Sequence, residues 1–137
     1  MRIVGPLLAV LALVTACATA DSGTDAGGAS HSRNDLTVEA DAGDGSPSQS
    51  WTLTCDGAAD GTLPDPATAC AHLQGMDEPF APLPNGVACT EQFGGAQTAH
   101  VSGVWDGDPV DLELSRSDGC RIAQWDGLGP LLPIPVG

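Results

Sequence analysis

Cysteine is the residue type that most constrains this chain, because five cysteines occur in 137 residues. They are Cys17, Cys55, Cys70, Cys89 and Cys120. The aromatic residues are three tryptophans and two phenylalanines, whereas glycine and proline number 18 and 11. A chain with so few large apolar side chains builds a small core, and small domains of this kind usually need disulfides. We therefore predict one small, disulfide-stabilised domain in an oxidising compartment.

The first 16 residues predict an export signal. Arg2 is followed by an apolar run that ends at Val14, and this run is shorter than the roughly 20 residues of a transmembrane helix. Residues 14–17 resemble a bacterial lipobox, with an aliphatic residue and two small residues before a cysteine. We predict that residues 1–16 are removed and that Cys17 carries a lipid, which gives a cell-surface lipoprotein. An ordinary signal peptide cut at Ala-x-Ala, which gives a secreted protein, is the alternative.

Residues 17–34 predict a lipidated N-terminus followed by a flexible tether. Apart from Cys17, they include no aliphatic residue larger than alanine. Such a segment buries too little apolar surface to offset the entropy lost on ordering it. We expect residues 35–137 to form the folded domain, which contacts the membrane only through the lipid.

The charge balance excludes nucleic acids as partners. Eighteen acidic residues stand against four arginines, and the formal net charge is −14. The phosphates of DNA and RNA repel so acidic a chain.

Alternation of apolar and polar residues predicts four strands in the domain. They are expected over residues 36–40, 49–55, 97–105 and 110–115. The last two flank Asp-Gly-Asp-Pro, which is typical of a hairpin. Residues 56–64 are expected to form a loop.

Helix signals are weaker. Asp65 as N-cap and Pro66 at the first helical position predict a short helix that ends before Gly75. A helical turn is expected over residues 122–125. The apolar tail over 129–135 is broken by prolines and is expected to lie extended on the domain.

With Cys17 lipidated, four cysteines remain, and four cysteines can pair in three ways. Pairing of neighbours would give Cys55–Cys70 and Cys89–Cys120, but the spacing does not choose among the three.

Metal sites are disfavoured, and no cofactor is predicted. Zinc lacks a Cys-x-x-Cys pair, and the histidines are scattered. Calcium binding at Asp41 and Asp44, or at Asp56 and Asp60, is an alternative that lacks the spacing of an EF-hand loop.

Catalytic motifs are missing as well. The chain has no Gly-x-Ser-x-Gly, no His-Glu-x-x-His and no phosphate-binding loop. His72 is expected on a helix surface and His100 in a strand, and neither is predicted to act as a base. The prediction is therefore that the protein is not an enzyme.

Three segments, taken in order, resemble the SSI-type subtilisin inhibitor family. Residues 51–55 are similar to its Thr-Leu-Thr-Cys strand. Residues 61–73 resemble its Gly-Thr-x-Pro-x-Pro loop and Cys-Ala-x-Leu helix, and residues 101–107 resemble its Val-x-Gly-Val-Trp-x-Gly hairpin. The resemblance extends from Leu36 to Trp125.

The resemblance implies an α+β fold, an antiparallel sheet of about five strands with two short helices. It implies the disulfides Cys55–Cys70 and Cys89–Cys120. Members of the family are substrate-like inhibitors of secreted serine proteases and often form homodimers, so both properties are expected of this chain.

The resemblance also implies a reactive peptide bond, two residues after Cys89, between Glu91 and Gln92. We define the reactive loop as residues 88–93, which adds Ala88, Cys89, Thr90 and Phe93. The expected partner is an extracellular serine protease of the subtilisin-like, trypsin-like or glutamate-specific class.

Several residues depart from the family pattern. Thr90 stands where the family often has proline, and Glu91 stands where Met or Lys is usual. Glutamate suits a protease that cuts after glutamate. One extra residue near Gly94 and Gly95 predicts a looser loop, and Asp118 replaces a loop-supporting polar residue. A binding module at the cell surface, with the same fold and a loop that no longer inhibits, is therefore the alternative function.

Overall fold

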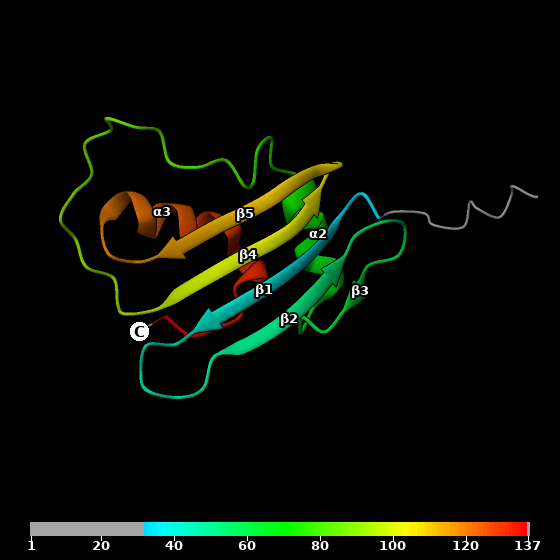
Figure 1. The fold of residues 1–137 in the computed structure, drawn as a ribbon, viewed down its shortest axis with the longest axis horizontal. Helices are drawn as coiled ribbons and strands as arrows, with labels where there is room; N and C mark the ends of the chain where they lie inside the picture. The colour runs from blue at the N-terminus through cyan, green and yellow to red at the C-terminus, as the bar shows by residue number, and fades with distance from the viewer. Residues whose placement is uncertain (1–31, 137) are drawn as a thin grey trace, which may run out of the picture. The chain divides into compact units, whose positions relative to one another are not determined.

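The strands of the protein form one antiparallel sheet in the order β3-β2-β1-β4-β5. The computed structural model describes residues 32–136. Within them the strands are β1 (Asp35–Asp41), β2 (Gln49–Thr54), β3 (Asp60–Gly61), β4 (Thr98–Trp105) and β5 (Asp108–Ser115). The helices in this range are α2 (Pro66–Gln74), α3 (Gly119–Leu128) and the short 3-10 helix η1 (Gly129–Leu131). Figure 1 shows the helices against one face of the sheet. The predicted α+β fold is confirmed.

The central strand β1 sets the core by its alternation. Val38 and Ala40 face the helices and pair with Val101 and Ala99 of β4, so apolar side chains meet across the strands. The buried set continues into both helices and the tail, with Leu73, Trp125, Leu128, Leu131, Leu132 and Ile134. Removal of this surface from water is what holds the helices on the sheet.

Helix α2 begins as its sequence predicts. The Asp65 side chain accepts a hydrogen bond from the Thr68 backbone N–H at 3.1 Å, and Pro66 occupies the first turn. Hydrogen bonding from the Thr68 side chain, together with its backbone N–H, lowers the pKa of Asp65. Gly75 forms the C-cap.

Three elements differ from the sequence predictions. The expected loop over 56–64 contains β3, a two-residue strand that pairs with the end of β2. The expected helical turn over 122–125 is part of the ten-residue helix α3, and the Asp118 side chain caps its start by accepting a hydrogen bond from the Arg121 N–H at 2.9 Å. The tail begins with the η1 turn instead of being extended throughout.

The folded unit also includes residues that were predicted as the end of the tether. The Asn34 carbonyl accepts from the Cys55 N–H at 2.9 Å, and its side-chain oxygen accepts from the Asp106 N–H at 2.8 Å. The Arg33 carbonyl accepts from the Gly107 N–H at 3.0 Å. The predicted signal over 1–16, the lipidation site Cys17 and the tether up to residue 31 lie outside the described residues. No helix within residues 32–136 has the length and apolar character for crossing a membrane.

Candidate functional site

Two disulfides connect the helices to the rest of the domain, in the pairing that the family resemblance implies. Cys55–Cys70 joins the end of β2 to α2, with the Cα atoms 5.6 Å apart. Cys89–Cys120 joins the segment before β4 to the first turn of α3, with the Cα atoms 5.3 Å apart. The second disulfide ties the predicted reactive loop to a helix.

The predicted reactive loop lies on the surface. Residues 84–93 are all exposed and belong to no helix or strand. Two apolar side chains stand out: Phe93 is 70% exposed and Val87 is 52% exposed. In Figure 1 the segment that leads into β4 runs along the outside of α3. Glu91 and Gln92 are therefore open to a macromolecule.

A contact with α3 fixes the amino-terminal side of the Glu91–Gln92 bond. The Gly119 N–H donates to the Thr90 carbonyl at 3.0 Å, one residue after the disulfide-bonded Cys89. A Cβ atom on Gly119 would overlap the Thr90 hydroxyl. Glycine at this position therefore allows the loop to lie close to the helix.

The carboxyl-terminal side is fixed as well, at Gly94. The Gly94 N–H donates to the Arg116 carbonyl at 2.8 Å, and the Arg116 Nε donates to the Gly94 carbonyl at 3.3 Å. A Cβ on Gly94 would come within 2.7 Å of the Ile122 Cδ1. The glycine that was expected to loosen the loop instead allows close packing, so for Gly94 that expectation is wrong.

Arg116 is the functional candidate that the sequence analysis missed. Its side chain is 9% exposed, its Nη1 lies 2.6 Å from the Asp126 Oδ1, and its guanidinium lies 5.9 Å from the centre of the Trp125 ring. The sequence did contain a signal for the burial of this arginine, because the alternation that buries Leu112 and Leu114 continues to position 116.

The acidic residues considered for metal binding accept hydrogen bonds from backbone N–H groups, three of them locally and Asp56 from the distant Asn34. Asp41 accepts from the Gly43 N–H at 2.7 Å, and Asp44 accepts from the Ser46 N–H at 2.9 Å. Asp56 accepts from the Asn34 N–H at 3.1 Å, which lowers the pKa of Asp56. Asp60 accepts from the N–H of the glycine that follows it, at 2.8 Å.

One further group places Asp118 within 4.8 Å of the sulfurs of Cys89 and Cys120. Because these sulfurs are bonded to each other, they do not offer thiolates to a metal.

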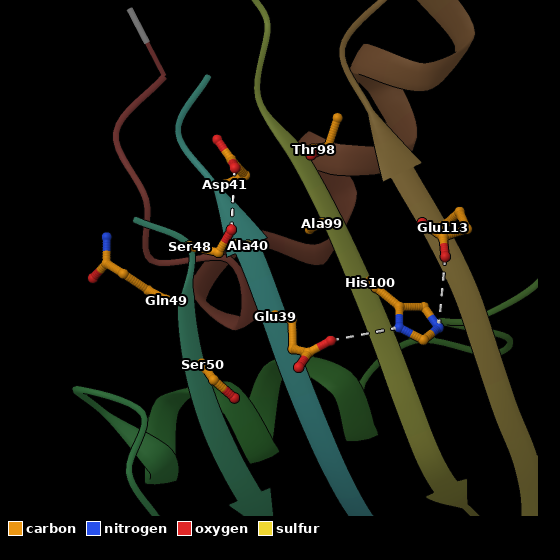
Figure 2. A pocket seen from close by; sticks show the side chains of 10 residues that line it. All are labelled: Glu39, Ala40, Asp41, Ser48, Gln49, Ser50, Thr98, Ala99, His100 and Glu113. Atoms are coloured by element: carbon orange, nitrogen blue, oxygen red, sulfur yellow. Dashed lines mark hydrogen bonds and ion pairs between the residues drawn. The ribbon is translucent and has the colours of Figure 1, made fainter. Parts of the chain in front are cut away.

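His100 lies within a cluster of carboxylates on the face of the sheet opposite the core (Figure 2). Its Nε2 is 2.6 Å from the Asp111 Oδ1 and 3.7 Å from the Glu113 Oε1, and its Nδ1 is 4.0 Å from the Glu39 Oε2. The hydrogen bond to Asp111, helped by the charges of Glu113 and Glu39, raises the pKa of His100 above its ordinary value of 6.5, although burial acts in the opposite direction.

This cluster predicts a pH-dependent stability. A raised folded-state pKa stabilises the fold fully below the unfolded-state pKa, and this stabilisation is lost as the pH rises through the folded-state pKa. Because His100 is one-third exposed, we expect only about 0.5 kcal/mol. Between about pH 5 and about pH 9, the free energy of unfolding should therefore fall by about 0.5 kcal/mol more in the wild type than in His100→Gln. Urea unfolding curves recorded across this pH range measure the difference.

His72→Gln is the matched control, since the His72 Nε2 bonds to the Gly127 carbonyl at 2.8 Å and not to a carboxylate. A His100→Gln curve parallel to the wild-type curve would contradict the prediction.

Residues 30–117 match the family model described as subtilisin inhibitor-like. Subtilisin inhibitor-like protein 7 of Streptomyces ambofaciens is 36% identical over 76 residues, which cover 54% of this chain and 69% of the relative. Trypsin inhibitor STI2 of Streptomyces longisporus is 36% identical over 77 residues, which cover 55% of this chain and 53% of the relative.

Among solved structures, Streptomyces caespitosus sermetstatin in complex with Bacillus licheniformis subtilisin is similar with a TM-score of 0.47 and 23% sequence identity. That similarity covers 73% of this chain and 97% of the other.

Proposed function

Because the chain belongs to the subtilisin inhibitor-like family, we propose that it inhibits extracellular serine proteases through residues 88–93, which enter the protease cleft as a substrate does. In this proposal Glu91 fills the specificity pocket of the protease. The Glu91–Gln92 bond is the one presented to the protease serine, and Phe93 contacts the protease on the other side of that bond.

The observation that carries the proposal is the exposed loop with a fixed residue on either side. Thr90 bonds to Gly119 before the reactive bond, and Gly94 bonds to Arg116 after it. A segment that is already ordered loses little conformational entropy when it binds, so more of the contact energy appears as affinity. Exposure and order together are what a substrate-like inhibitor requires.

An inhibitor of this type needs no catalytic group, and we propose that the protein is not an enzyme and uses no cofactor. The two histidines within the described residues have other partners. His72 bonds to a backbone carbonyl and His100 to carboxylates, so neither is paired with a hydroxyl or thiol nucleophile.

Glu91 favours a glutamate-specific protease as the target. A carboxylate is poorly accommodated in an apolar pocket and is repelled by a pocket with an aspartate at its base. A pocket that recognises glutamate carries positive charge or donors, and the net charge of −14 favours approach to a positive surface.

We further propose that the protein is exported and held at the cell surface by a lipid on Cys17. Radiolabelled fatty acid should be incorporated into the wild type and not into Cys17→Ala.

We also propose that the protein forms a homodimer. Its molecular mass in solution, which should be twice that of one chain, tests this.

The test of the function is an inhibition panel with the mature protein. We expect inhibition of a glutamate-specific protease at nanomolar concentrations, as is common for protease inhibitors, and weak inhibition of subtilisin and trypsin. Mass spectrometry of the complex should find slow cleavage between Glu91 and Gln92 only. If the glutamate-specific protease, subtilisin and trypsin all keep full activity with micromolar concentrations of this protein, the proposal is refuted. The alternative, a binding module with the same fold, is then favoured.

A further inference from the structure

Helix α3 contacts the chain on both sides of the proposed reactive bond. Its first turn supplies Gly119 and Cys120, which bind Thr90 and Cys89. Its last turns supply Trp125 and Asp126, and both contact the Arg116 side chain. Because Arg116 in turn bonds to Gly94, one helix controls the position of both halves of the loop.

Arg116 is suited to this connection by its shape and by its burial. A buried guanidinium is unfavourable unless its charge and donors are matched, and Asp126 provides the matching carboxylate at 2.6 Å. The planar guanidinium directs Nη1 to Asp126 and Nε to the Gly94 carbonyl. A lysine ammonium has no second, separated donor with which to make both contacts.

We propose that Arg116 is a positioning residue for the proposed inhibitor: it holds the segment after the reactive bond in place, so that a bound protease re-forms the bond instead of releasing a cut loop. This inference rests on the proposed function. No contact between Arg116 and the protease is required.

The chemistry shows why position matters. Attack by the protease serine hydroxyl on the Glu91 carbonyl carbon forms an ester and breaks the bond to Gln92, whose nitrogen leaves as an amine after taking up a proton. Return attack by that amine on the ester re-forms the peptide bond and restores the serine hydroxyl. Attack by water instead leaves a Glu91 carboxylate and a permanently cut inhibitor. The outcome depends on how long the Gln92 amine stays near the ester.

The distance along the chain makes Gly94 the relevant point of attachment. Gly94 follows Gln92 by two residues, so a fixed Gly94 keeps the Gln92 amine within about 7 Å of the Gly94 position. The next attachment is the buried Gln97, whose Nε2 donates to the Pro135 carbonyl at 3.4 Å just before β4, and five residues allow about 17 Å. Loss of the Arg116 side chain leaves only the backbone bond from Gly94, which we expect to loosen the segment without freeing it.

The test compares Arg116→Met with Arg121→Met. Arg121 lies on α3, its side chain is 47% exposed, and it bonds to Asp118, so its replacement removes the same charge without touching Gly94. In the protease complex, we expect cut inhibitor to accumulate roughly tenfold faster with Arg116→Met than with the wild type or Arg121→Met. The rate of complex formation should change little. Arg116→Lys should behave more like the methionine variant than like the wild type.

A second measurement needs no protease. In the free protein, exchange of the Gly94 amide hydrogen, which is bonded to the Arg116 carbonyl, should accelerate roughly tenfold in Arg116→Met and stay unchanged in Arg121→Met. If the wild type inhibits no protease, the proposed function fails, and this exchange measurement still decides whether Arg116 holds the segment.

Two results would overturn the inference: unchanged exchange and cutting in a folded Arg116→Met, or equal acceleration in Arg121→Met. If Arg116→Met does not fold, Asp126→Ala decides, because the Asp126 side chain is 57% exposed and its removal takes away the acceptor of Nη1 while the Arg116 stem stays in place. Faster cutting and exchange in Asp126→Ala support the inference, and wild-type rates in both measurements refute it.

Discussion

Replacing both Cys89 and Cys120 by alanine is expected to weaken inhibition at least a hundredfold. The disulfide is adjacent to the reactive loop and joins it to α3, so its loss lets the loop sample conformations that do not fit the protease cleft. The free energy of unfolding should fall by about 4 kcal/mol, from the entropy of a 31-residue closed segment in the unfolded chain. Inhibition constants and urea unfolding curves measure the two effects separately.

The matched control is Cys55→Ala with Cys70→Ala. That bridge closes 15 residues between β2 and α2, away from the loop, and its loss should cost about 3 kcal/mol through the same entropy. We expect the folded fraction of this control to inhibit as the wild type does. Equal loss of inhibition per folded molecule in both variants would mean that the Cys89–Cys120 disulfide has no special role in the loop.

Replacing Glu91 by lysine should change the target of the inhibitor. A lysine side chain pairs with the aspartate at the base of a trypsin-type pocket, which repels the wild-type carboxylate. We expect trypsin inhibition to improve by about a thousandfold, which corresponds to about 4 kcal/mol at a central contact, and inhibition of the glutamate-specific protease to fall by a similar factor. Because Glu91 is exposed, the thermal unfolding midpoint should stay nearly unchanged.

Glu78→Lys makes the same charge change at another exposed position and is the control. It should leave the relative inhibition of the two proteases unchanged. A folded Glu91→Lys that inhibits trypsin no better than the wild type, or a Glu78→Lys variant that switches equally, would exclude Glu91 as the specificity residue.

The sheet and the first helix were predictable because their signals are local. The alternation over residues 36–40 and 97–105 places each side chain on its face, and the cap at Asp65 marks where α2 begins. The hairpin between β4 and β5 follows from its turn residues. The two disulfides matched the pairing of the resembling family, whereas the spacing alone left three pairings open.

Where the prediction fell short, contacts distant in sequence decide the structure. Gly119 and Gly127 disfavour a helix, yet α3 forms because Trp125 and Leu128 bury their side chains in the core. Strand β3 is too short to show alternation and exists through its pairing with β2. These elements follow from packing more than from local preference.

The surroundings of the proposed loop were only partly predictable. Its position on the surface followed from the family resemblance, but the role of Arg116 depends on Asp126, ten residues later on another element. Likewise, the need for glycine at position 94 appears only when Ile122 of α3 is seen beside it. A pair of glycines in a sequence indicates freedom of the backbone, and only the fold reveals whether that freedom or the small size is used.

Strand β5 ends the sheet on one side, and its composition affects how copies of the protein behave at high concentration. An uncovered outer strand offers unpaired backbone groups to which a strand of another molecule can add. Here Pro109 lacks an N–H group, and the outward side chains of Asp111 and Glu113 carry like charges that oppose such addition. We therefore expect the same strand that supplies Leu112 and Leu114 to the core to oppose fibrillar self-association at neutral pH.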